Sequence, residues 1–435
     1  MSTDPTGPAA FGDALRRFRE KAGFSQAELA KRANYSKSHL SRIEHGHKQP
    51  SLALARACDR ELGARGELVK HVAPTIVDVP DAAGPHGDIW TLSMTSDGQT
   101  EFSALDRTSS VANGTQQWMG WIIGPPYGWA GAAEHVVPAF HGWFVDLRRL
   151  GQRAPSGLVS QMLISATNVV RGVVATTAAS ERVAMLELAS RFAEYTGWMA
   201  QENGSDAAAL WWTAYAVRLA DAAGDRETAT YALVRRADIA LYQGDSMRTI
   251  ALSREAQASD CHVRIRGLAA QREAQGHAYA GDEEACRAAL ERATAWAAQT
   301  RDTEAGAQFG SSTMPDSLAF ATAWCLNDLG YPADAASMLE DQIRSLGPRA
   351  HRTRARFGAR LAVSLAEAGE VDRACDAVAP VLELAPVIDS ATVRHDLRNF
   401  SRSVGRWRRR PLVRATLTDL AYALRVHSLE PIRYA

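Results

Sequence analysis

Hydrogen-bond donors and positive charges gather in the short segment 36–48, which also carries a regular set of apolar positions. Lys37, Ser38 and Arg42 fall on one face of a helix, since positions 38 and 42 are one turn apart, and His39 lies beside them. Arg can donate two hydrogen bonds to O6 and N7 of guanine, Lys does so more loosely, and Ser can bond either kind of base edge. These residue types predict a helix that reads base edges in a major groove.

Other polar residues near this segment suit the sugar-phosphate backbone. Ser36 caps the expected helix and stands at the end that would enter a groove. His47, Lys48 and the backbone amides near Ser25 are candidates for phosphate contacts. Such contacts set the register of a protein on DNA but carry no sequence information.

Clear start and stop signals divide the surrounding residues into short helices. Ser25 and Glu28 form an S-x-x-E capping box, Asn34 tolerates a left-handed turn, and Gly46 and Gly63 close helices. The expected helices are Phe11 to Lys21, Gln26 to about Ala33, Ser36 to about His45 and Leu52 to Leu62, with a further turn at Arg65 to His71.

Order, spacing and residue types in this segment match a known domain. The matching residues are Leu15 to Glu20, Gly23 to Ala30, Ser36 to Glu44, Gly46 and Pro50. Residues 11–65 therefore resemble the helix-turn-helix domain of the lambda-repressor and Xre family, in which the third helix reads DNA. The resemblance implies that Gln26 contacts the backbone and braces the reading helix. It also implies a semi-buried ion pair between Arg19 and Glu44, although Glu44 could instead be a solvated charge at a helix end.

The resemblance also implies a homodimer. One head of this kind covers only a few base pairs, so such proteins gain affinity by binding inverted half-sites about one helical turn apart. The expected partner is therefore double-stranded DNA with an inverted-repeat operator. The expected dimer surfaces are a β-hairpin near residues 89–105 and the Trp-rich segment 111–150.

Charge and composition agree with a basic head on an acidic body. Residues 1–71 hold 13 Lys and Arg against 8 Asp and Glu, while the whole 435-residue chain is neutral.

No sequence motif indicates a metal site, a cofactor or catalysis. The five cysteines are far apart, and metal-ligand spacing, a phosphate loop and a nucleophile motif are all absent. We therefore expect no metal site, no cofactor and no enzymatic activity. No signal peptide or membrane span is expected, which predicts a cytoplasmic protein.

The second half of the chain is helical and rich in Ala, and a pattern recurs along it. A small residue precedes a turn glycine by seven positions, and another small or slender residue follows twelve positions after the first. These sets are Gly197, Gly204 and Ala209; Ala237, Gly244 and Thr249; Ala274, Gly281 and Cys286; Ala323, Gly330 and Ala335; and Ala362, Gly369 and Ala374. Small residues let two antiparallel helices pack closely, and the turn between them needs glycine. The pattern loosely resembles tetratricopeptide repeats, with a non-repetitive helical bundle as the alternative.

These observations predict a mostly α-helical chain. The expected divisions are a disordered tail at 1–10, a five-helix DNA-binding domain at 11–71, a linker at 72–88, a connecting and dimerisation region with a β-hairpin at 89–157, and a helical-repeat solenoid at 158–430. A head and body of these two kinds resemble actinobacterial, Streptomyces-like regulators.

Two functions of the helical body, residues 158–430, are compatible with the sequence. It binds a peptide or small signal that modulates DNA binding, as in firmicute relatives, or it is a scaffold that recruits a protein partner without a signal. Four tryptophans are candidates for a signal pocket or, alternatively, a dimer core: Trp118, Trp121, Trp129 and Trp143.

A stripe of arginines at i+4 spacing lies near the end of the chain. It consists of Arg394, Arg398, Arg402 and Arg406. The stripe is either a solvated helix face or a second contact to DNA or to an anionic ligand.

Overall fold

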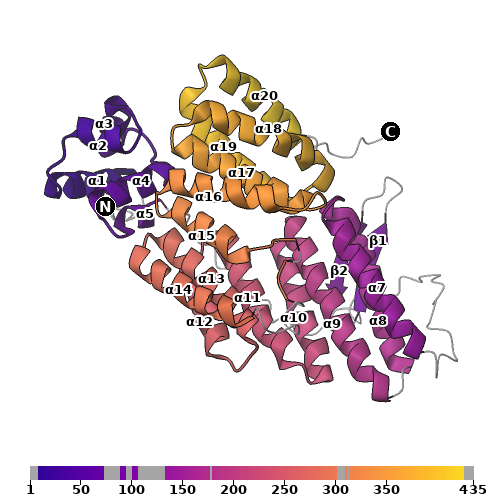
Figure 1. The fold of residues 1–435 in the computed structure, drawn as a ribbon. Coiled ribbons are helices and arrows are strands. Elements are labelled where there is room, and N and C mark those ends of the chain that lie inside the picture. The colour runs from indigo at the N-terminus through magenta and orange to yellow at the C-terminus, as the bar shows by residue number, and fades with distance from the viewer. Residues whose placement is uncertain are drawn as a thin grey trace. The chain divides into compact units, whose positions relative to one another are not determined.

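The computed structural model describes the chain in several stretches (Figure 1). These are residues 8–72, 89–94, 100–105, 133–176, 179–300, 309–311 and 313–425. The expected tail, linker and hairpin turn lie wholly or mostly outside the described residues. The described chain is mostly helical, as the sequence predicts, and folds into two compact units. The first holds α1–α5 and α11–α20, and the second holds β1, β2 and α7–α10.

The N-terminal helices begin and end close to the expected residues. They are α1 (Pro8–Lys21), α2 (Gln26–Arg32), α3 (Lys37–Glu44), α4 (Leu52–Leu62) and α5 (Glu67–Lys70). Ser25, Ser36 and Ser51 cap α2, α3 and α4 with their hydroxyl groups. The core of this domain is formed by apolar side chains from all five helices, including fully buried Leu40 and Ile43 of α3.

The remaining helices of the first unit form successive hairpins. They are α11 (Arg226–Gln243), α12 (Ser246–Ala258), α13 (Val263–Ala280), α14 (Glu283–Thr300), α15 (Ser317–Asp328), α16 (Pro332–Ser345), α17 (His351–Glu367), α18 (Val371–Ile388), α19 (Ala391–Val404), the 3-10 turn η2 (Gly405–Trp407) and α20 (Pro411–Arg425). Each odd-numbered helix from α11 to α17 packs on the next helix and also on the next odd-numbered one. This arrangement is a row of stacked helix pairs.

The repeated small residues lie where the paired helices meet. The hydroxyl of Thr249 donates to the carbonyl of Ala237 over 3.4 Å, and Ala274 and Cys286 share one buried cluster. The five turn glycines all have positive φ, between 78° and 94°, a region that residues with a Cβ rarely adopt. The structure therefore gives the sequence pattern a physical basis in close helix pairs.

Within the described residues, the second unit contains a strand pair and four helices. The strands β1 (Ile89–Met94) and β2 (Thr100–Leu105) are antiparallel, with Ile89 opposite Leu105. The helices are α7 (Ala133–Gly151), α8 (Ser156–Thr176), α9 (Ala179–Glu202) and α10 (Asp206–Ala223). Helices α8–α10 thus group with the strand pair, whereas we expected all helices after residue 158 to form one domain.

One described helix has the length and composition of a membrane span. The window Ser156–Val174 of α8 has a mean hydropathy of 1.2 and is 39% buried within the structure. Core helices of other proteins share these properties, so length and composition alone do not decide its role.

Candidate nucleic-acid interface

Helix α3 presents its polar face outward because its apolar face is fixed in the core. The hydroxyl of Ser36 accepts a hydrogen bond from the backbone N–H of His39 over 3.2 Å and starts the helix. Leu40 is fully buried. Lys37, Ser38 and Arg42 are exposed on the other side, and His39 is half-buried. The structure thus brings the expected base-reading side chains to one exposed helix.

The end of α3 is tied to the other helices through Glu44, whose side chain is buried. Arg19 of α1 donates to both carboxylate oxygens, with Nε 2.6 Å from Oε1 and Nη2 3.1 Å from Oε2. Gln26 of α2 donates from Nε2 to Oε2 over 2.7 Å. The hydrogen bond to Glu44 raises the pKa of Arg19, so the guanidinium keeps its charge. Because one carboxylate links three helices, Gln26 can hold α3 in place through Glu44.

The phosphate-contact candidates occupy different environments. The backbone N–H of Ser25 donates to Oε2 of Glu28 over 2.8 Å, and the N–H of Glu28 donates to the Ser25 hydroxyl. These two amides are therefore already bonded within the capping box. His47 and Lys48 are exposed beyond α3.

The surroundings of His39 favour the neutral form of its imidazole. Nζ of Lys48 lies 3.3 Å from Nδ1 of His39. Burial lowers the pKa of His39, and the nearby charges of Lys48, Arg406 and Arg42 lower it further. A neutral imidazole at this place can both donate and accept a hydrogen bond.

The N-terminal domain, α1–α5, packs on the helical hairpins of the same unit, which the sequence did not predict. Nη1 of Arg56 on α4 lies 2.7 Å from Oδ1 of Asp328 on α15. Nδ2 of Asn34, in the α2–α3 turn, donates to the carbonyl of Ala368 over 3.2 Å. Nη1 of Arg406 donates to the carbonyl of Asn34 over 3.0 Å. These residues are more than 270 positions apart in the sequence, so no local pattern could indicate their contact.

Turn glycines of three hairpins lie directly against the domain. A Cβ built on Gly281 would lie 2.5 Å from the Cα of Gly66, and one on Gly330 would lie 3.1 Å from the carbonyl oxygen of Arg56. A Cβ on Gly369 would lie 3.0 Å from Nδ2 of Asn34. The same glycines that turn the chain therefore also make room for the docked domain.

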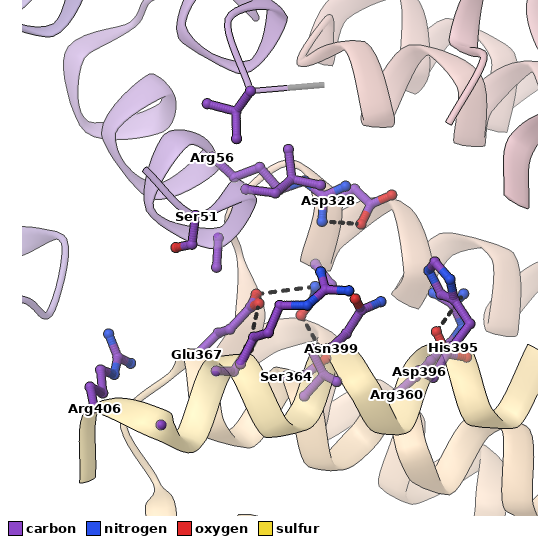
Figure 2. Close-up of a pocket in the computed structure, with 18 of the residues that line it drawn as sticks. Ser51, Arg56, Asp328, Arg360, Ser364, Glu367, His395, Asp396, Asn399 and Arg406 are labelled. Atoms are coloured by element: carbon purple, nitrogen blue, oxygen red, sulfur yellow. Dashed lines mark hydrogen bonds and ion pairs between the residues drawn. The ribbon is translucent and has the colours of Figure 1, made fainter. Parts of the chain in front are cut away.

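A cavity of about 1120 Å³ lies between the domain and the hairpins (Figure 2). Its deeper part is polar: Nη2 of Arg360 lies 3.1 Å from Oδ1 of Asp396, and Asn327 and Ser403 donate hydrogen bonds to Glu367. Burial raises the pKa of both Asp396 and Glu367 despite these partners. Ser36, His39, Arg42 and Lys48 line the outer part. Apart from the arginine stripe, no pattern in the sequence indicates this cavity.

Of the four tryptophan candidates, Trp143 alone lies within the described residues. Trp118, Trp121 and Trp129 lie outside the described residues. Trp143 is half-buried on α7, with its ring centroid 5.9 Å from that of Phe192 on α9. At this position the tryptophan takes part in packing between helices of the second unit.

Comparisons with known proteins agree with this geometry over the N-terminal domain. A family model described as a helix-turn-helix domain matches residues 10–72. The chain is similar to an uncharacterized HTH-type transcriptional regulator of Sinorhizobium fredii, with 34% identity over 97 residues, 21% of this chain and 46% of the relative. The chain therefore spans about half the length of that relative. No solved structure matches the chain.

Proposed function

We propose that this protein is a sequence-specific DNA-binding regulator of transcription of the lambda-repressor and Xre kind. The observation that carries the proposal is a capped helix, α3, that exposes Lys37, Ser38 and Arg42 and is braced at its far end through Glu44. Such a helix fits the major groove, where its N-terminal side chains reach base edges. The proposal places the protein with chromosomal DNA in the cytoplasm and assigns it no catalytic step.

Selection of bound sequences from random duplex DNA tests this function. The wild-type chain should enrich a defined motif, and Arg42→Ala should lose preference at one base pair per half-site, at a cost of about 1–3 kcal/mol. Arg17→Ala is a matched control, because Arg17 is an exposed arginine on α1. A motif unchanged by Arg42→Ala would reject the assignment of Arg42 to the groove.

We propose further that the active form is a homodimer on an inverted repeat. A single α3 contacts few base pairs, and two-fold symmetry doubles the interface with half-sites about 34 Å apart. Analytical ultracentrifugation with and without the selected duplex tests this. A monomer at micromolar concentration in both conditions would contradict it.

The docked arrangement favours control of DNA binding by a small molecule or peptide. The cavity touches both α3 and the hairpins, which resemble tetratricopeptide repeats, so a molecule held there would change how firmly the two are joined. Its buried Arg360–Asp396 pair and its hydrogen-bonded Glu367 offer donors and acceptors to a polar molecule. Here the cavity, rather than the tryptophans, is the proposed site.

Native mass spectrometry of the purified chain distinguishes this control from a scaffold role. A small bound mass that is released on denaturation, and that is absent from Arg360→Met, would support the signal. A stable complex with another protein, formed with no small mass present, would support the scaffold instead. Arg344→Met is the control, because Arg344 is an exposed arginine that does not line the cavity.

A further inference from the structure

The arginine stripe, which runs along α19 into η2, does not form one uniform surface. Arg394 forms an ion pair with Asp389, and Arg406 is half-buried and donates to the carbonyl of Asn34. Arg398 and Arg402 are exposed, but only Arg402 lines the cavity shared with α3. The structure therefore divides the stripe into a paired end, an exposed middle and a docking end.

Several exposed cations line the cavity next to this docking end. Arg402, Arg408 and Arg409 line the same cavity as Arg42 and Lys48 of the DNA-binding domain. Within the described part of the chain, none of these five forms an ion pair with a carboxylate. Like charges that have no ion-pair partner repel one another, and an anion placed between them reduces that repulsion.

Arg406 fixes this docking end beside the start of α3. Its guanidinium donates to the carbonyls of Asn34 and Ala366, each over 3.0 Å. Its Cζ lies 4.5 Å from the ring centroid of Tyr35, the residue before the α3 cap, and 3.9 Å from that of Trp407. The segment η2 is thus joined through one side chain to the turn that leads into the helix proposed to read DNA.

We infer that Arg402, Arg408 and Arg409 form a second DNA contact, which binds backbone phosphates beside the half-site read by α3. The inference rests on the proposed function. Duplex DNA carries one negative charge per about 1.7 Å of its axis, so a duplex on α3 extends phosphates past the neighbouring surface. Exposed arginines suit phosphate, because the guanidinium can donate two parallel hydrogen bonds. These contacts add affinity but no base preference.

Salt dependence of binding measures the second contact directly. Binding of the full chain to its selected duplex is titrated over a range of salt for wild type and for Arg408→Gln/Arg409→Gln. We expect the slope of log affinity against log salt to shrink by about 0.9 for each phosphate that the variant no longer neutralises, so by about 1.8 for two. The sequence motif from the random-DNA selection should not change, because both substitutions affect phosphate binding alone.

Arg398→Gln is the matched control, since Arg398 is exposed on α19 but does not line the cavity. Its slope should equal that of wild type. Thermal unfolding of each variant shows that the fold is retained. A double variant with an unchanged slope, or with tighter DNA binding, would overturn the second contact alone. A wild-type chain that selects no duplex would overturn the proposed function as well.

Discussion

At the scale of single residues, the pKa of the buried carboxyl of Glu273 on α13 depends on the hydrogen bonds that it accepts. Oε1 accepts from Arg254 over 2.7 Å, and Oε2 accepts from Gln257 over 2.8 Å and from Arg292 over 2.6 Å. Burial alone would raise the pKa of this carboxyl. Hydrogen bonds from His277, Arg254, Gln257 and Arg292 outweigh burial and hold the pKa well below its usual range.

A lowered carboxyl pKa makes stability depend on pH. The ionised Glu273 stabilises the fold above the unfolded pKa of 4.5, and this contribution is lost progressively as pH falls below that value. We therefore expect Glu273→Gln to lose about 3 kcal/mol of unfolding free energy at pH 7 and clearly less at pH 3. Urea denaturation at both pH values measures this. The exposed Glu284→Gln is the control, and an equal loss for Glu273→Gln at both pH values would refute the argument.

At the scale of elements, close packing of paired helices limits the size of side chains. Ala274 of α13 is fully buried in a cluster with Cys286 and Ala289 of α14. Leucine at position 274 would force the two helices apart, and we expect a loss of about 1–3 kcal/mol of stability. Ala288→Leu, on the exposed side of α14, should change stability by less than about 0.5 kcal/mol. Thermal or chemical denaturation compares the two, and equal effects would contradict close packing at position 274.

The starts of helices and the turns between them could largely be predicted from the sequence. Ser25, Ser36 and Ser51 each start a helix by accepting a hydrogen bond from the backbone N–H three positions on, so the signal lies within a few residues. The turn glycines are equally local, because a positive φ at one residue decides whether a side chain is tolerated. The family match covers only residues 10–72, so the likeness of the hairpins to tetratricopeptide repeats stays a prediction.

At the scale of the whole molecule, the sequence could not show how the first unit is assembled. Asn34 bonds to Ala368, and Arg56 pairs with Asp328, across hundreds of residues. Spacing along a chain predicts only contacts within a helix or turn. Arg406 illustrates this, because its i+4 spacing predicted either a solvated face or a contact to DNA or an anionic ligand, whereas its guanidinium donates to the carbonyl of Asn34 in the N-terminal domain.

Because the N-terminal domain packs against Gly281, alanine at this position should do more than strain the backbone. Gly281 and Gly224 both end helices at nearly the same φ, 78° and 79°, so alanine at either should cost roughly 1–2 kcal/mol of strain. A Cβ at Gly281 would also collide with Gly66, whereas nothing lies within 4 Å of one at Gly224. Gly281→Ala should therefore separate the DNA-binding domain from the hairpins as well as strain the turn.

Amide hydrogen exchange distinguishes these two effects. In wild type, the N–H groups of Gly66, Leu68 and Val69 donate to the buried carboxylate of Asp59 beside the docking surface. Undocking exposes this region to water, so Gly281→Ala should speed exchange throughout α4 and α5, while Gly224→Ala should leave it unchanged. If both variants left exchange in α4 and α5 as in wild type, the domain would not depend on the hairpin turns. If Gly281→Ala alters it and Gly224→Ala does not, the turns of the helical hairpins hold the N-terminal domain in place.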